Sequence, residues 1–273
     1  MISGISGSDA GPLGRIGSLE VRLARGAREI AAALTLRHKV FYEELGATGD
    51  PAIAPARQDK DQIDSICDHL IVVDRSRAGD GQIVGTYRLL LHDRAHRAGG
   101  FYSDGEFELS ALTERHAGMR FLELGRSCVL SQYRSKRTIE VLWQGIWAYC
   151  NQHSVDVMAG CASFPGTVPA RHAQALSFLA HFRRADSGWD VRALASRYNA
   201  MDLMPAEAVD PKAAFMAMPP LIKGYVRLGA MTGDGCVIDR QFNTIDVMMI
   251  LPRASISQRY IDHFGADASR FAA

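Results

Sequence analysis

The sequence predicts one mixed α/β domain. Amphipathic helical segments and apolar strand-like runs alternate in the order helix, hairpin, strand, helix, strand, helix, strand. No linker interrupts residues 19–265, and there is no internal repeat. Residues 1–18 are rich in glycine and serine, which predicts a disordered lead, and residues 266–273 are expected to form a mobile tail.

The first half of the chain is expected to contain one helix and a hairpin. Residues 25–46 have apolar side chains at helical spacing and end at a glycine. Arg37 falls on the apolar stripe of this helix, where an arginine usually forms a buried ion pair or contacts a ligand. Residues 68–74 and 82–92 are strand-like and flank a turn containing glycine and aspartate, which favours a hairpin.

The second half is expected to add three strands and three helices. Strands are predicted at residues 121–130, 155–164 and 243–251, the last of them closing the sheet. Helices are predicted at residues 137–150, 169–184 and 219–230.

Composition excludes several classes of protein. Lysine and arginine number 31 and aspartate and glutamate 30, so no global charge favours a nucleic-acid partner. The five cysteines form no C-x-x-C, which argues against a zinc site or a redox pair and favours reduced cysteines in the cytosol. The first residues lack the basic start and apolar run of a secretory signal, and no apolar stretch approaches the roughly 20 residues of a membrane span. We therefore expect a cytoplasmic protein without a bound metal.

The segment "FLELGRSCVLSQYRSKR" carries the strongest functional signal. Glu123 and Arg126 would point to opposite faces of a regular strand, but Gly125 between them permits a bulge that re-aims side chains. A basic loop follows at the start of the next helix, where backbone amides and the helix dipole favour phosphate. A solvated turn is the alternative reading of this charge run.

A strand, a bulge, a phosphate loop and a helix in this order resemble the acetyltransferase (GNAT) superfamily. The resemblance implies a mixed sheet flanked by helices, here with a C-terminal helix/strand extension. The coenzyme A loop of that superfamily has glycines where this chain has Ser135 and Arg137, which suits a carrier-protein thioester better. Phosphopantetheine and carrier contacts are then expected at Tyr133, Arg134, Ser135, Lys136, Arg137 and Thr138.

Sparse motifs in the same order resemble the acyl-homoserine-lactone synthases. They are R-x-x-x-F at Arg37 and Phe41, D-x-x-D at Asp61 and Asp64, an arginine at Arg88, and E-x-x-R at Glu123 and Arg126. Those synthases carry a tryptophan shortly after the first motif, where this chain has Ala47.

A closer resemblance covers nearly the whole chain. "LELGRSCV", "YRSKRTIEVLWQGI" and the late "PPLIKGYVRLGA" and "FNTIDVMMIL" are similar to ornithine-acyl-carrier-protein N-acyltransferases. This implies transfer of a 3-hydroxyacyl chain from acyl carrier protein to the α-amine of L-ornithine, giving lyso-ornithine lipid, with no further cofactor. The alternatives are another amino-acid acceptor such as lysine or glutamine, lactone synthesis, or a non-catalytic module that binds acyl carrier protein.

Roles follow from the chemistry of an amine and a thioester. Glu123 is the candidate base, with Arg126 beside it in the motif, and the three motif arginines could bind the substrate carboxylate or brace the acids. Asp61, Asp64 and Glu123 could hold the amines, although the two aspartates could equally cap a loop. Backbone amides at Cys128, Val129 and Leu130 are candidates for the oxyanion site. Ser127 lies in no G-x-S-x-G elbow, so direct attack without an acyl-enzyme is expected.

Residues 219–230 have two interpretations. A core helix packed on the sheet is favoured, since most such helices are core. The alternative is an interfacial helix, with Lys223 and Arg227 bordering an apolar face, that makes peripheral contact with an anionic inner membrane.

Overall fold

The computed structural model describes residues 11–49, 56–258 and 260–261. They fall into two compact units, and each is described by itself. Unit 1 contains residues up to 89 together with 125–154 and the last described residues, and unit 2 contains residues 90–124 and 155–257. The single domain expected over residues 19–265 stays a prediction, and the chain passes from one unit to the other within strand β5 (Phe121–Val129). The predicted tail at 266–273 lies outside the described residues.

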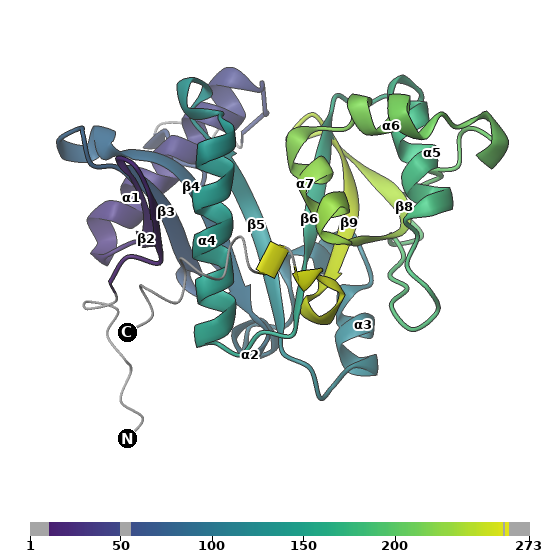
Figure 1. The fold of residues 1–273 in the computed structure, drawn as a ribbon, viewed down its shortest axis with the longest axis horizontal. Helices are drawn as coiled ribbons and strands as arrows, with labels where there is room; N and C mark the ends of the chain where they lie inside the picture. The colour runs from purple at the N-terminus through teal and green to yellow at the C-terminus, as the bar shows by residue number, and fades with distance from the viewer. Residues whose placement is uncertain (1–10, 50–55, 259, 262–273) are drawn as a thin grey trace. The chain divides into compact units, whose positions relative to one another are not determined.

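Unit 1 is built on an antiparallel meander, followed in strand order by the second half of β5. Its strands are β1 (Gly14–Ile16), β2 (Leu19–Leu23), β3 (Asp68–Asp74) and β4 (Ile83–Leu91). Each pairs with the next, and β3 and β4 form the predicted hairpin (Figure 1). Part of the lead predicted to be disordered is therefore ordered, because Gly14–Ile16 pairs with β2 and Leu13 is buried, while residues 1–10 lie outside the described residues.

The helices of unit 1 are α1 (Gly26–His38), which continues as a π-helical turn at Lys39–Glu44, and α4 (Lys136–Gln152). Helix α4 packs on β1, β2 and β3. Gly145 allows this close approach, because a Cβ there would lie 2.6 Å from the Cγ2 atom of Val21. Ile139, near the start of α4, is 40% exposed.

Unit 2 contains the first half of β5, followed in strand order by β6, β9, β8 and β7. The bounds are β6 (Val157–Pro165), β7 (Tyr198–Asn199), β8 (Met231–Asp239) and β9 (Thr244–Pro252). The pairing of β5 with β6 is parallel and covers Phe121–Glu123, whereas the other pairs are antiparallel. The helices are α2 (His92–Arg97), α3 (Leu109–Arg115), α5 (Ala173–Phe182), α6 (Pro211–Ala217) and α7 (Pro220–Leu228) (Figure 1).

Strand β9 does not close the sheet, because β8 and β7 follow it. The sequence of β8 contains Gly233, Asp234 and Gly235, which resemble a turn, and its register with β9 shifts between Thr232 and Cys236. A strand of this composition gives little signal in the sequence.

Helix α7 belongs to the core of unit 2, as the favoured interpretation predicted. Ile222, Tyr225, Val226 and Leu228 are buried, and the helix contacts β6 and β9. It ends at Gly229, which has a left-handed φ of 96°. Within the described part of the chain, no helix is both long and apolar enough to span a membrane.

Candidate active site

The middle of β5 departs from regular strand geometry. Arg126 has a φ of 51°, a left-handed conformation that a non-glycine residue seldom adopts and that is often found at functional sites. The side chain of Arg126 reaches Asp59 through Nε at 3.1 Å and Asp61 through Nη2 at 3.3 Å. The backbone after Gly125 therefore directs an arginine into a cluster of acids.

This cluster, the arginine–aspartate network, joins all three motif arginines to three aspartates within unit 1. Its members are Arg37, Arg88, Arg126, Asp59, Asp61 and Asp64. Arg37 binds Asp64 with both terminal nitrogens, at 2.6 and 3.2 Å, and its Nε donates to Asp59 at 2.7 Å. Arg88 donates from Nη1 to Asp61 at 2.6 Å and to Asp64 at 3.3 Å.

Most side chains of the arginine–aspartate network are buried. The Arg37 side chain is 1% exposed and that of Asp64 is 3% exposed, whereas Asp61 remains 26% exposed. Burial alone would raise the pKa of Asp64, but the Arg37 hydrogen bond and the charges of Arg37 and Arg88 outweigh it and lower the pKa to about 2. Three positive and three negative charges neutralise one another, which offsets the cost of burying them.

Asp61 and Asp64 also perform the capping role that the sequence allowed. Asp61 caps the turn Gln62–Ser65 by accepting from the amides of Ile63 and Asp64, and Asp64 accepts from the amide of Asp61 in return. The structural and functional interpretations therefore coincide here. Since both aspartates already accept hydrogen bonds from arginine, bracing of the acids is the role that the geometry displays.

Phe41 was a predicted site residue, whereas Asp59 was not. Phe41 lies in the π-helical turn after α1 and is half-buried, and such turns are frequent at functional sites. Asp59 was missed, although it accepts from both Arg37 and Arg126. It precedes the D-x-x-D motif by two residues in a polar loop, and nothing in its spacing distinguishes it from a solvated aspartate.

The proposed carrier loop, residues 133–138, contains side chains that hold its conformation and side chains that are exposed. Ser135 caps α4 by accepting from the Thr138 amide at 3.3 Å, and the Thr138 hydroxyl donates to the Tyr133 carbonyl at 2.6 Å. The Tyr133 hydroxyl donates to Asp74 at 2.7 Å. These three side chains hold the loop, so the contacts we predicted for them would have to come from their backbone atoms.

The basic side chains of the loop are more open. Lys136 is 90% exposed and forms an i,i+4 ion pair with Glu140, at 3.4 Å. Arg137 is exposed, and Arg134 is 45% exposed while paired with Glu44. The charges therefore surround the first turn of α4, where the N–H groups lack intrahelical partners.

One part of the predicted oxyanion site is not available. The Leu130 amide donates to the Val84 carbonyl at 2.9 Å, because the chain still follows β4 at that point. Cys128 is 6% exposed, and its burial raises the pKa of the thiol, so it behaves as a core residue. Of the three amides proposed, those of Cys128 and Val129 remain candidates.

Glu123 lies in unit 2 and holds a turn. One carboxylate oxygen accepts from the Tyr102 amide at 2.9 Å and the other from the Ser103 amide at 2.8 Å. These residues begin the 3₁₀ turn Tyr102–Gly105. Glu123 is 4% exposed, so the orientation of its carboxylate is fixed by these two amides.

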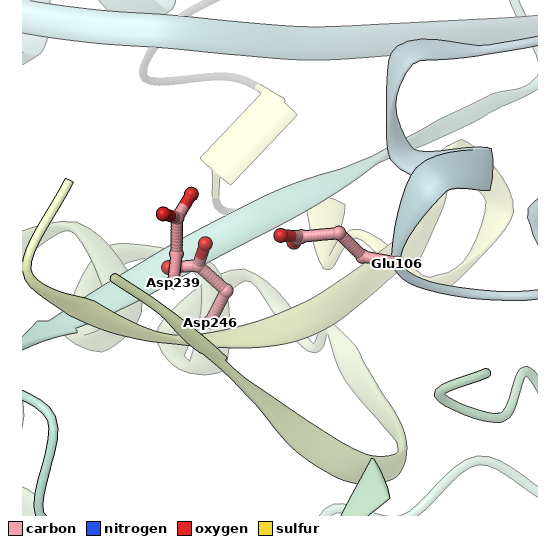
Figure 2. A group of neighbouring side chains, drawn as sticks. All are labelled: Glu106, Asp239 and Asp246. Carbon is pink, nitrogen blue, oxygen red and sulfur yellow. The ribbon is translucent and has the colours of Figure 1, made fainter. Parts of the chain in front are cut away.

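A second acidic group in unit 2 escaped the sequence analysis. Glu106, Asp239 and Asp246 have carboxylate oxygens that all lie within 4.8 Å of one another. Figure 2 shows the Glu106 side chain extending toward the two aspartates, which project from β8 and β9. Such an arrangement of oxygens could hold a cation, either an ammonium group or a divalent metal.

The electrostatics of Glu106 are unusual for a carboxyl group. Burial and the charge of Asp246 raise its pKa, Arg197 opposes them, and the outcome is a pKa of about 7. Arg197 contacts one carboxylate oxygen at 3.1 Å, and the Cys161 thiol donates to the other at 3.6 Å. The acids come from three separate segments without motif spacing, so only the folded chain reveals the group.

Comparison with known proteins places this geometry in a family. Residues 36–144 match the acetyltransferase (GNAT) domain model. The N-acyl amino acid synthase FeeM from uncultured soil microbes has a similar fold, with a TM-score of 0.48 and 11% identity over 86% of this chain and 90% of that one.

Relatives of much higher similarity span almost the whole chain. The L-ornithine N(alpha)-acyltransferase of Rhizobium meliloti is 57% identical over 95% of this chain and 88% of its own length. That of Brucella abortus is 57% identical over 97% of this chain and 95% of its own, and that of Rhodobacter capsulatus 41% identical over 90% and 95%. This chain therefore belongs to the L-ornithine N(alpha)-acyltransferase family of enzymes, built on the acetyltransferase fold.

Proposed function

We propose that this enzyme transfers a 3-hydroxyacyl chain from acyl carrier protein to the α-amine of L-ornithine. The observation that carries the acceptor is the 57% identity, over 95–97% of the chain, to relatives named L-ornithine N(alpha)-acyltransferase. The 3-hydroxyacyl donor on acyl carrier protein is what the resemblance of the sequence motifs implies. The product would be lyso-ornithine lipid. The arginine–aspartate network and the fixed Glu123 carboxylate agree with it, since both offer charges suited to an amino acid.

The reaction is a direct aminolysis of a thioester. The neutral α-amine attacks the acyl carbon, a C–N bond forms, the C–S bond breaks, and the pantetheine sulfur leaves as a thiolate that takes up a proton. We assign the removal of the amine proton to Glu123, directly or through one water. The thioester is already activated, so fixing the amine in position supplies much of the rate.

Recognition of ornithine is assigned to the network. An arginine guanidinium can bind a carboxylate through two parallel hydrogen bonds. Arg126, the most open of the three arginines at 11% side-chain exposure, is assigned this contact, while Arg37 and Arg88 brace the aspartates. Asp61, which is the aspartate most open to solvent, is the member of the network best suited to meet an amine.

Recognition of the donor is assigned to the carrier loop. The first turn of α4 would bind the single phosphate of phosphopantetheine through backbone amides. Arg134, Lys136 and Arg137 would meet the acidic surface of the carrier protein. Cys128 and Val129 would supply the amides that stabilise the oxyanion.

The test is an acceptor panel. Purified enzyme is incubated with 3-hydroxyacyl carrier protein and with ornithine, lysine, glutamine or S-adenosylmethionine, and products are identified by mass spectrometry. N-acylornithine as the dominant product is expected. A dominant product from another amine would replace ornithine as acceptor, an acyl lactone would indicate synthase activity, and carrier binding without turnover would indicate a non-catalytic module.

A further inference from the structure

A chain of hydrogen bonds in unit 2 connects Glu123 to Glu106. Ser103 is the link, because its amide donates to Glu123 at 2.8 Å while its hydroxyl lies 3.4 Å from the Cys161 sulfur. The Cys161 thiol donates to the Glu106 carboxylate at 3.6 Å. A carboxylate that the proposed mechanism does not use is thus three contacts from the candidate base.

The backbone closes this chain into a ring. The amides of Glu106 and Phe107 both donate to the Ser103 carbonyl, at 2.9 and 2.8 Å. Glu106 therefore contacts the turn Tyr102–Gly105 through its main chain and, through Cys161, also through its side chain. Ser103 is 1% exposed, so a rotation of its side chain would not be compensated by solvent.

Charged and polar side chains from several segments of unit 2 surround Glu106. The groups that face it are Cys161 on β6, Asp239 on β8, Asp246 on β9 and Arg197 from the segment that leads to β7. Two of the four are carboxylates, so an ionised Glu106 is unfavourable for stability. A buried residue that opposes stability in this way is a candidate for function.

We propose that Glu106 is a positioning residue for acyl transfer, which acts through Cys161 and Ser103 to hold the amides that orient Glu123. The inference rests on the proposed role of Glu123 as the base. Glu106 itself is not required to touch the substrate.

The donor and the acceptor of each hydrogen bond in this chain can be assigned. Burial and the nearby acids raise the pKa of the Cys161 thiol well above its ordinary value, so the sulfur keeps its proton and acts as a donor. An ionised Glu106 accepts from that thiol, and the thiol sulfur then accepts from the Ser103 hydroxyl.

The first experiment measures amide hydrogen exchange at Tyr102 and Ser103 by NMR. Cys161→Ala should reduce the protection of these two amides by about tenfold, because it removes a link of the chain. Glu106→Gln should reduce it by less, because a neutral amide oxygen is a weaker acceptor than a carboxylate. Cys161→Ser, which restores a donor, should recover most of the protection. Glu108→Gln is the control, since Glu108 lies on the same segment and is exposed. Unchanged protection in Glu106→Gln would overturn the proposal.

The second experiment separates positioning from folding. Glu106→Gln should lower kcat for ornithine acylation by about tenfold with little change in KM, and without lowering the thermal midpoint. A variant that keeps wild-type kcat, or that loses activity and thermal stability together, would contradict a positioning role.

Failure of this inference can be told apart from failure of the proposed function. If wild-type enzyme acylates a different amine, the acceptor is wrong and the same variants are assayed with the correct one. If Glu106→Gln frees the two amides but kcat is unchanged, the positioning role is overturned while ornithine transfer stands.

Discussion

Glu123 has a structural role beside the chemical role proposed for it. Its two oxygens accept from the amides of Tyr102 and Ser103, which fixes the orientation of the carboxylate. The same holds for Asp61 and Asp64, which cap a turn and pair with arginines. At these positions a structural explanation does not compete with a functional one.

Glu123→Gln should lower kcat by roughly two or more orders of magnitude near neutral pH, in the range typical of a general base. The glutamine amide still offers one oxygen to the turn, so the protein should fold. Turnover and circular dichroism measure the two effects, with Glu108→Gln as the exposed control on a nearby segment. Wild-type turnover in Glu123→Gln would remove this residue from the mechanism.

At the scale of elements, α4 has a buried body and an exposed, cationic first turn. Its body packs Val141, Leu142, Ile146 and Tyr149 against the strands of unit 1, while its first turn carries exposed cations. The cap at Ser135 fixes where that turn begins.

Reversal of Lys136 and Arg137 to glutamate should raise KM for acyl carrier protein far more than KM for a free pantetheine thioester. The reason is that the two charges meet the carrier surface, and the salt dependence of KM should become flatter as well. Steady-state kinetics with both donors measures this. Arg171→Glu, an exposed arginine in unit 2, is the matched control. An equal rise for both donors would show that the loop serves the phosphate and not the protein.

Helix α7 should behave as a core helix. Ile222 is 0% exposed, so Ile222→Ala should lower the free energy of unfolding by about 2–5 kcal/mol, whereas Arg227→Ala should cost much less. Urea unfolding measures both. If Lys223→Glu with Arg227→Glu abolished sedimentation with anionic vesicles, the interfacial interpretation would have to be restored.

At the scale of the whole molecule, two buried carboxyl groups make stability depend on pH in opposite directions. The pKa of Asp64 falls from its ordinary 3.8 to about 2, so its contribution is complete above pH 3.8 and is lost as pH falls through about 2. The pKa of Glu106 rises from 4.5 to about 7, so its contribution is complete below pH 4.5 and is lost as pH rises through about 7.

The free energy of unfolding should therefore be greatest between about pH 4 and 5. Above pH 7, Glu106→Gln should be more stable than wild type by on the order of 3 kcal/mol, and at pH 4.5 the two should be nearly equal. Asp64→Asn should flatten the loss of stability below pH 4. Urea titrations across pH 3–8 test both, and a Glu106→Gln variant less stable than wild type at pH 8 would contradict this account.

The sequence by itself determined the family, most of the regular elements and the identity of the motif residues. Apolar periodicity was sufficient for α1, α4, α5 and α7 and for five of the strands, because each buries a face through local, regular spacing. The position of the basic loop before α4 followed from a cluster of cations at the start of a predicted helix. The arginines at 37, 88 and 126 were expected to meet carboxylates, and the structure joins them to three aspartates.

Tertiary structure alone decided the rest. Strand β8 was not predicted because it contains glycine and aspartate, which are typical of turns. It is held as a strand by its pairing with β9. Asp59 could not be identified because its arginine partners are 22 and 67 residues away. The ring from Glu123 through Ser103 and Cys161 to Glu106 arises from β5, a turn and β6, and the unusual pKa of Glu106 arises from burial and from acids on β8 and β9. Burial and proximity between distant segments leave no periodicity in a sequence, and they exist only once the chain has folded.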